Sequence, residues 1–244
     1  MNRPALLIPN FNHKDTIASL LDRLAVHQLP CLIVNDGSGP ETRQVLEQQE
    51  QARDWVTLLH LPKRSGKGGA VLAGLLQLHA QGYTHAVQLD ADGQHDPADV
   101  PRFLEPSATQ PSALILGHPV YDAGVPKARL IGRQISRFWV WVETLSFAIA
   151  DPLLGFRVYP LAAVAALARR CRLGTRMDFD PEIAVRLCWD GVPIVNVATR
   201  IAYPAGGTSH FQLVRDNVLI TWLHTRLFFG MLIRLPRLLA RRRN

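Results

Sequence analysis

Short apolar runs alternate with longer amphipathic stretches over the first 120 residues, and no other feature of the chain constrains its fold as much. Runs of about five apolar or β-branched residues are typical of strands, whereas apolar residues three or four positions apart are typical of helices. A repeated strand–helix alternation builds a mostly parallel sheet with helices on both faces. The predicted fold class is therefore α/β, with an open and mostly parallel sheet.

The element boundaries follow from the same pattern. Strands are expected at Ala5–Pro9, Cys31–Asn35, Val56–Leu61, His85–Asp90 and Ala113–Gly117. Helices are expected at Asp15–Ala25, Glu41–Ala52, Gly69–Gln81 and Pro97–Leu104. Beyond residue 120 come a basic amphipathic stretch, a short segment, two helices and a β-like run, at Lys127–Ile149, Gly155–Pro160, Leu161–Arg170, Glu182–Leu187 and Pro193–Ile201 respectively.

The charge of the chain is concentrated at its C-terminal end. Of a net charge of +7, the segment 211–244 carries +6, because it holds seven arginines and one acid. No repeat or low-complexity linker divides the 244 residues. With 48% hydrophobic residues, a disordered or fibrous chain is excluded. We therefore expect one catalytic domain over residues 1–210, followed by a basic amphipathic helical tail over residues 211–244.

The tail combines its arginines with aromatic residues. Trp222, Phe228 and Phe229 lie among leucines and isoleucines between Arg215 and Arg234, and the tail ends in the run Arg241-Arg242-Arg243 before Asn244. This composition is typical of a helix in the interface of an anionic membrane, where each basic residue contributes about 1 kcal/mol. An ordinary C-terminal helix packed on the body is the alternative. A nucleic-acid partner is not expected, because no nucleic-acid-binding motif is visible.

Neither a secretion signal nor a membrane span is expected. The apolar run Ala5–Ile8 is too short for a signal peptide. The two most apolar regions are interrupted by Glu143 and by His224 and Arg226, so no stretch is expected to reach the about 20 apolar residues that cross a bilayer. Three cysteines without a CxxC pair argue against a disulfide framework or a zinc site. The expected location is the cytoplasm, peripheral on the inner face of the cell membrane.

The strongest chemical signal is the string DADGQHDP, which begins at Asp90 at the end of the fourth expected strand. Ligands of open parallel sheets bind at that edge. Two carboxylates one residue apart, Asp90 and Asp92, can meet a hard cation there, with the oxygen of Gln94 as a further ligand. Such a cation, Mg²⁺ or Mn²⁺, would neutralise charge on a leaving diphosphate. The alternative is that these residues only form a turn and start a helix.

Two more motifs follow strands. An Asn35–Asp36 pair ends the second strand and can bind a base or ribose, or else form a turn that caps the next helix. The segment Lys63–Ala70 leads through glycines and cations, Lys67 among them, into a helix whose N-terminus favours anions. A plain glycine-rich turn is the alternative there, because neither GxxxxGK[ST] nor GxGxxG is matched.

Six motifs occur in the order seen in family-2 glycosyltransferases: Pro9–Asn12, Val34–Ser38, Gly66–Ala70, Asp90–His95, Gly155–Arg157 and Gly206–His210. Over about residues 5–210 the chain most resembles the dolichyl- or polyprenyl-phosphate sugar transferases. This resemblance implies a GT-A fold, a nucleotide-sugar donor carrying uridine or guanosine, a divalent metal and inversion at the anomeric carbon.

The resemblance also assigns residues to the donor site. Pro9 and Phe11 would line the base pocket, and Asn35 and Asp36 would contact base or ribose. Asp90 would face the ribose, and Asp92 and Gln94 would hold the metal. Lys67 and His210 would meet the donor diphosphate, with His210 standing where the family commonly has lysine.

The chain departs from the family elsewhere. Asn35 replaces a common Asp, His13 an acidic residue, and Gly117-His118-Pro119 the family's Gly-Ser-Arg. The missing arginine normally serves phosphate binding, so either its role passes to Arg129 or Arg133, or the acceptor differs.

The acceptor decides whether a base is needed. A lipid phosphate is already an anion, whereas a hydroxyl needs a carboxylate within hydrogen-bond reach. Asp180, with Glu182 second, is the candidate for this catalytic role; alternatively Asp180-Pro181-Glu182 only begins a helix. The predicted function is transfer of a sugar from a UDP- or GDP-sugar to a lipid-linked, polyprenyl-phosphate-like acceptor. The alternatives are transfer to a hydroxyl of a lipid or polyketide-like acceptor, and a non-enzymatic protein that binds nucleic acid or a membrane.

Overall fold

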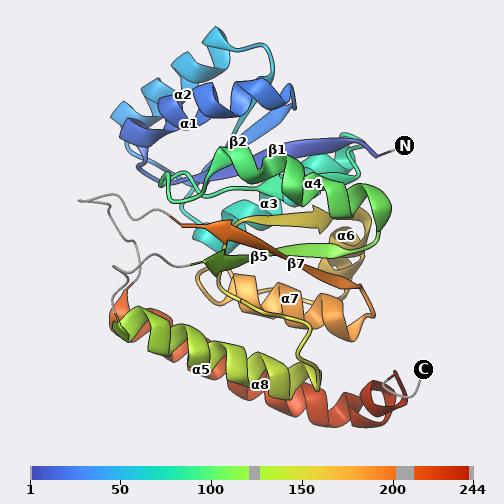
Figure 1. Cartoon of the computed structure of the whole chain (residues 1–244). Coiled ribbons are helices and arrows are strands. Elements are labelled where there is room, and N and C mark those ends of the chain that lie inside the picture. Colours follow the sequence, from blue (N-terminus) through green and yellow to red (C-terminus); the bar gives the residue numbers. More distant parts are fainter. Residues whose placement is uncertain (1, 121–126, 202–211, 242–244) are drawn as a thin grey trace.

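The computed structural model describes residues 2–120, 127–201 and 212–241. Its centre is a seven-stranded sheet of order β3-β2-β1-β4-β6-β5-β7 (Figure 1). The strands are β1 (Pro4–Asn10), β2 (Cys31–Asn35), β3 (Val56–His60), β4 (His85–Gln88), β5 (Leu114–Val120), β6 (Arg157–Pro160) and β7 (Ile194–Arg200). Only β6 is antiparallel to its neighbours, β4 and β5, within the described chain. The predicted open and mostly parallel sheet is confirmed.

Helices cover both faces of this sheet (Figure 1). One face carries α1 (Lys14–Leu24), α2 (Pro40–Ala52) and α4 (Val100–Thr109), with short 3-10 turns at Ala25–His27 and Pro97–Asp99. The other carries α3 (Lys67–Ala80), α6 (Leu161–Arg170) and α7 (Phe179–Trp189). Beyond α7, the helices α5 (Lys127–Thr144) and α8 (Leu213–Arg241) lie side by side and form a third layer (Figure 1).

Burial on both faces explains why the first strand is a continuous apolar run. Leu6 and Ile8 pack into the core under α1, whereas Ala5 and Leu7 pack into the core under α3. Successive side chains of a strand point to opposite faces, so a strand covered on both sides needs apolar residues at every position. The sheet therefore has two cores, and its carboxyl edge is left for polar side chains.

Several boundaries differ from those expected. The helix expected at Glu182–Leu187 begins earlier, at Phe179, so Asp180 lies in its first turn. The stretch Lys127–Ile149 is helical only to Thr144, and the segment Gly155–Pro160 contains the antiparallel strand β6. The strand β6 has only four residues and pairs with strands distant in sequence, so its local apolar pattern is too weak to predict a strand.

The tail forms α8, which packs against the body. Leu223, Leu227 and Met231 are buried in the same core as α3 and α7. The boundary expected at residue 210 lies outside the described residues. The expectation that no stretch is apolar enough to span a membrane is wrong by length and composition, because the helix Arg215–Arg241 is long and apolar enough to do so. Only 22% of its most apolar part is buried inside the protein. One such helix is weak evidence of a membrane span. The expectation failed because the few charges of the segment do not offset the hydropathy of its leucines, isoleucines and aromatic residues.

Candidate active site

A lysine bridges two carboxylates at the edge of the sheet where β4 ends. Nζ of Lys67, in the first turn of α3, lies 2.9 Å from Oδ2 of Asp90 and 3.1 Å from Oδ2 of Asp180. Burial acts to lower the pKa of Lys67, but the two carboxylates outweigh it and raise that pKa above its usual value. We call Lys67, Asp90 and Asp180 the Lys67 cluster. It joins three segments far apart in sequence at the edge where open sheets bind ligands.

Three side chains contact the carboxylate of Asp90. Besides Lys67, its carboxylate accepts a hydrogen bond from Nε2 of Gln88 at 3.2 Å and lies 3.5 Å from Nε2 of His95. Burial acts to raise the pKa of Asp90, but Lys67 and His95 outweigh it and lower that pKa below its usual range. A Cβ on Gly155 would lie 2.3 Å from Oδ2 of Asp90, so only glycine fits there. The first aspartate of the string is therefore an ionised partner of Lys67.

The buried side chain of Arg157 is hydrogen-bonded to the first turn of α7. It is fully buried and donates to the backbone oxygens of Pro152, Leu154 and Asp180, the last at 2.7 Å. Its Nη1 also lies 3.8 Å from Oδ1 of Asp180, an oxygen without a hydrogen-bond partner among the described residues. Asp180 is therefore brought into the site, with one oxygen facing Lys67 and the other near Arg157.

Glu182 is not brought into the cluster. Its Oε2 accepts from the backbone N–H of Gly174 at 2.7 Å, and its Oε1 accepts from Nε of Arg186 at 2.9 Å. Nη2 of Arg226 on α8 lies 3.7 Å from Oε2, and the glutamate is fully buried. Its carboxylate joins α7 to neighbouring elements, and positions two apart on a helix face different sides, so Glu182 does not lie beside Asp180. A catalytic role for Glu182 stays a prediction.

The glycines of the Lys63–Ala70 segment permit close packing. The backbone N–H of Gly69 donates to the oxygen of Thr175 at 3.0 Å. A Cβ on Gly66 would lie 2.5 Å from that same oxygen, and one on Gly68 would lie 2.2 Å from Cβ of Phe179. The chain before α7 thus covers the start of α3. The glycines of this segment do not form an open loop. Its Lys67 forms ion pairs with Asp90 and Asp180.

Asn35 and Asp36 are both engaged within the protein. Asp36 accepts from the backbone N–H groups of Ser65 and Gly66 at 2.6 and 2.8 Å, which fixes the loop before α3. Asn35 accepts from the N–H of Ser38 at 3.0 Å, and it also bonds to a histidine of β3. The turn that was the alternative for this pair is therefore present, but it does not cap α2, whose N-cap is Gly39 and which has no side-chain cap. A contact of Asn35 or Asp36 with a base stays a prediction.

The two residues expected at the base pocket, Pro9 and Phe11, differ in their exposure. Pro9 is buried within β1, whereas Phe11 is partly exposed just beyond that strand. The guanidinium carbon of Arg64 lies 3.7 Å from the centre of the Phe11 ring, a cation–π contact. Arg64 was not among the predicted site residues, although its place in a basic loop after a strand was a usable signal.

Asp92 and Gln94 are partly exposed beyond β4, and Oδ1 of Asp92 accepts from the backbone N–H of Gln94 at 3.0 Å. In the part of the chain that the structure describes, no three His, Cys, Asp or Glu side chains gather to hold a metal. That arrangement suits Mg²⁺ or Mn²⁺ bound by one carboxylate together with substrate phosphates, rather than a site made by the protein alone. The residues present therefore fit a cation shared with a diphosphate.

Of the two arginines expected to bind the acceptor phosphate, Arg129 and Arg133, the structure describes the side chain of Arg133 alone. Nη1 of Arg133 donates to Oδ2 of Asp151 at 2.6 Å, which ties α5 to the loop before β6. The side chain of Arg129 and all of His210 lie outside the described residues.

With this geometry in view, comparison with known proteins gives the family. The model of "Glycosyl transferase family 2" matches residues 5–170. The chain belongs to this family. The family-2 chain is 29% identical over 204 residues to the undecaprenyl-phosphate mannosyltransferase of Micrococcus luteus, covering 80% of this chain and 82% of that one. It is also 29% identical over 168 residues to the polyprenol monophosphomannose synthase of Mycolicibacterium smegmatis, covering 64% and 61%.

A solved structure gives the fold. Glucosyl-3-phosphoglycerate synthase from Mycobacterium tuberculosis, in complex with Mn²⁺ and UDP-glucose, matches with a TM-score of 0.69 at 15% identity, over 91% of this chain and 79% of that chain. The family-2 chain therefore has the GT-A fold and is a glycosyltransferase, as the sequence motifs predict.

Proposed function

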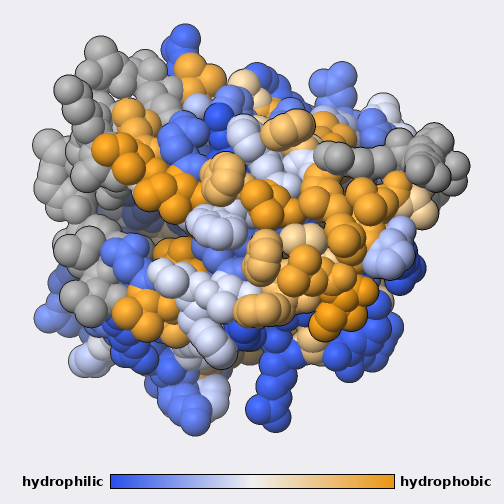
Figure 2. Space-filling model, turned by 90° about the horizontal axis from the view of Figure 1, so that it is seen from below, coloured by the Kyte–Doolittle hydropathy of each residue, from blue (hydrophilic) through white to orange (hydrophobic). Residues whose placement is uncertain are grey.

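We propose that this glycosyltransferase moves a sugar from a UDP- or GDP-sugar to a polyprenyl-phosphate-like lipid at the cytoplasmic face of the membrane. One observation carries the lipid acceptor: the layer of α5 and α8 exposes a large apolar face on the outside of the molecule (Figure 2). Its exposed members, together with Phe147 just after α5, are here called the apolar face: Ile131, Ile135, Phe138, Trp139, Phe147, Val218, Trp222, Phe229, Leu232, Ile233 and Leu239. The names of both curated relatives, which are prenyl-phosphate sugar transferases, support the same acceptor.

The composition of the apolar face fits a lipid surface. Ile233 is 81% exposed, Phe147 74% and Trp222 59%. A soluble surface rarely leaves so many large apolar side chains together in water. Tryptophan is enriched at the membrane–water interface, and the exposed Arg215 and Arg237 of α8 would meet anionic headgroups. A peripheral attachment to an anionic membrane follows.

Contacts along α8 favour a helix that lies on the membrane over one that crosses it. Its start is bound through Asp216 to Arg176, and its end through Nη1 of Arg241 to the backbone oxygen of Trp189 at 2.6 Å. Arg234 also stacks on the Trp189 ring, with 4.6 Å to the centroid. Crossing a bilayer would break all of these contacts and expose a buried aspartate to lipid, which is costly.

The donor would lie along the edge where β1, β2 and β4 end. Phe11 and Arg64 would border the base, and Asp92 and Gln94 would hold the divalent cation. When bound, that cation neutralises the negative charge that grows on the leaving diphosphate. Lys67 holds Asp90 and Asp180 in place, and positioning of donor and acceptor does most of the remaining work.

A phosphate acceptor needs no general base, since its attacking oxygen is already an anion. Attack from the face opposite the leaving diphosphate gives inversion. The second candidate acceptor is a lipid hydroxyl, and it has its own supporting observation. Oδ1 of Asp180 is buried and has no hydrogen-bond partner among the described residues, so it could accept a proton from a hydroxyl.

The test is direct transfer. The full chain is incubated with UDP- and GDP-sugars, Mg²⁺ or Mn²⁺, and either a short-chain polyprenyl phosphate or the corresponding polyprenol, with products identified by mass spectrometry. Transfer to the phosphate that Asp180→Asn slows, by loss of the ion pair with Lys67, but does not abolish supports the proposal. Transfer to the alcohol alone, abolished by Asp180→Asn, supports the second candidate. No transfer from any donor refutes both.

A further inference from the structure

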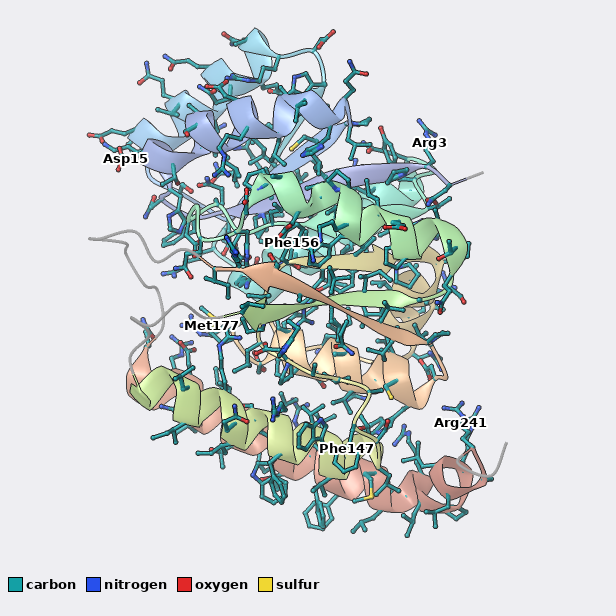
Figure 3. All side chains as sticks on the ribbon, viewed as in Figure 1. Arg3, Asp15, Phe147, Phe156, Met177 and Arg241 are labelled. Carbon is teal, nitrogen blue, oxygen red and sulfur yellow. The ribbon has the colours of Figure 1, made fainter. Side chains whose placement is uncertain are left out.

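The start of α8 is attached to the chain segment between α6 and α7 by a buried ion pair. Oδ1 of Asp216 accepts from Nε of Arg176 at 3.0 Å, and Oδ2 accepts from the backbone N–H of Gln212 at 2.7 Å. Asp216 is fully buried, and the Arg176 side chain is 16% exposed. Figure 3 shows Met177, the next residue in this segment, between the sheet and the layer of α5 and α8.

The same segment closes over the start of α3. The oxygen of Thr175, directly before Arg176, accepts from Gly69 N–H at 3.0 Å. A Cβ on Gly66 would lie 3.1 Å from Cγ of Arg176, so arginine and glycine are also in close contact. The backbone N–H of Arg176 in turn donates to Oδ1 of Asp178 at 3.0 Å.

These contacts lie between two members of the Lys67 cluster. Lys67 is in the first turn of α3, which Thr175 covers, and Asp180 follows the segment in the first turn of α7. A displacement of Thr175 would therefore change the 3.1 Å separation between Nζ of Lys67 and Oδ2 of Asp180. Asp216 is the only described residue of α8 that forms an ion pair with the segment 171–178.

We infer that Arg176 is a positioning residue for sugar transfer, and that Asp216 makes α8 part of the active-site framework. Arg176 touches no member of the Lys67 cluster in a hydrogen bond or ion pair that the structure describes. It acts through Thr175, which it holds against α3 while Asp216 holds its guanidinium. The helix that carries six of the eleven members of the apolar face thereby sets the geometry at the sugar-transfer site. This inference rests on the proposed function.

The experiment compares four variants of the full chain in the transfer assay. Asp216→Asn removes the charge of one partner at nearly constant size, and Arg176→Gln removes the charge of the other with a shorter polar side chain. Arg176→Lys keeps a cation within reach of Asp216. Arg170→Gln is the matched control, because Arg170 forms an exposed ion pair with Asp190 at the far end of α7. Donor-binding stoichiometry is measured by calorimetry alongside kcat and the donor KM.

The expected result is a fall in kcat of about 10- to 100-fold in Asp216→Asn and Arg176→Gln, as follows from a displacement of about 1 Å at reacting groups. The donor KM should change by less than about threefold, because the residues at the base are untouched. Donor binding should stay at about one per chain, Arg176→Lys should recover most of kcat, and Arg170→Gln should match the wild type.

Two results would overturn the inference. Turnover of Asp216→Asn and Arg176→Gln equal to that of Arg170→Gln would show that the pair does not position the site. A loss of kcat matched by an equal loss of donor-binding stoichiometry would show that the pair only keeps the chain folded. A wild-type chain that neither binds nor transfers any nucleotide sugar would instead refute the proposed function, and this inference with it.

Discussion

Gly155→Ala should damage both stability and turnover, because the added methyl group collides with Asp90. The new Cβ would lie 2.3 Å from Oδ2 and 2.7 Å from Cγ of Asp90. A carbon–oxygen contact needs about 3.3 Å, so the carboxylate must move by about 1 Å. That movement stretches the 2.9 Å contact between Lys67 and Asp90. Overpacking of this kind costs about 1–3 kcal/mol.

For a chain of this length, that cost lowers Tm by about 2–12 °C. A displacement of about 1 Å at a site of this kind costs up to about 100-fold in turnover. Thermal unfolding and the transfer assay measure the two effects separately. Gly155 lies outside the residues with positive φ, so the cost comes from the collision and not from backbone strain.

The matched control is Gly132→Ala, another glycine-to-alanine change in the same chain. Gly132 lies in α5, and nothing comes within 4 Å of an added Cβ. Alanine in a helix is favoured over glycine by about 0.5–1 kcal/mol, so this variant should be slightly stabilised and fully active. Equal stability and equal turnover of the two variants would refute the reasoning about Asp90.

Three further predictions concern other parts of the molecule. Trp222→Ser combined with Phe229→Ser should lower the fraction of protein that floats with anionic vesicles at least about tenfold, because two exposed aromatic anchors are lost. The control Val26→Ser, at an exposed residue of the 3-10 turn after α1, should leave flotation unchanged, and equal losses in both variants would contradict a specific apolar face. Asp92→Asn should abolish the rise in Tm that a nucleotide sugar with Mn²⁺ gives while leaving the Tm of the metal-free chain unchanged, and a persisting rise would remove Asp92 from the metal site. Burial, opposed by its histidine partner on α8, raises the pKa of Glu143 above its usual 4.5, so the stability that this carboxyl contributes at low pH is lost as the pH rises. The free energy of unfolding of the wild type should therefore fall relative to that of Glu143→Gln as the pH rises above the usual glutamate pKa of 4.5 in urea titrations, and parallel pH profiles would contradict this.

Much of the candidate site was predictable because it lies in short motifs after strands. The strand preceding Asp90 ends at the sheet edge, as predicted, and Asp92 with Gln94 remains open to solvent there. Asp180 reaches the same place. Such motifs are recognisable because a strand end and the turn after it are encoded by neighbouring residues.

The partners of these residues were not predictable. Nothing in the string around Asp90 indicates that Lys67 would neutralise it, and nothing near Glu182 indicates that the backbone N–H of Gly174 would occupy its Oε2. Only the pairing of Glu182 with Arg186, four residues along the same helix, follows from local spacing. Arg133, a predicted phosphate-binding residue, is likewise bound to Asp151. Which charged side chain meets which depends on elements brought together only by folding.

The sequence by itself determined the strand and helix pattern, the double-sided burial of β1 and the edge at which polar groups collect, since these depend on periodicity within a few residues. Only the tertiary structure decided that β6 runs antiparallel, that α8 packs back along α5, and that Arg157 is buried beneath Asp180. It also decided the purpose of the glycines before α3, which make room for Thr175 and Phe179. The physical reason is range: local patterning stabilises an element through its own neighbours, whereas close packing and ion pairing are set by residues that meet only when the whole chain is folded.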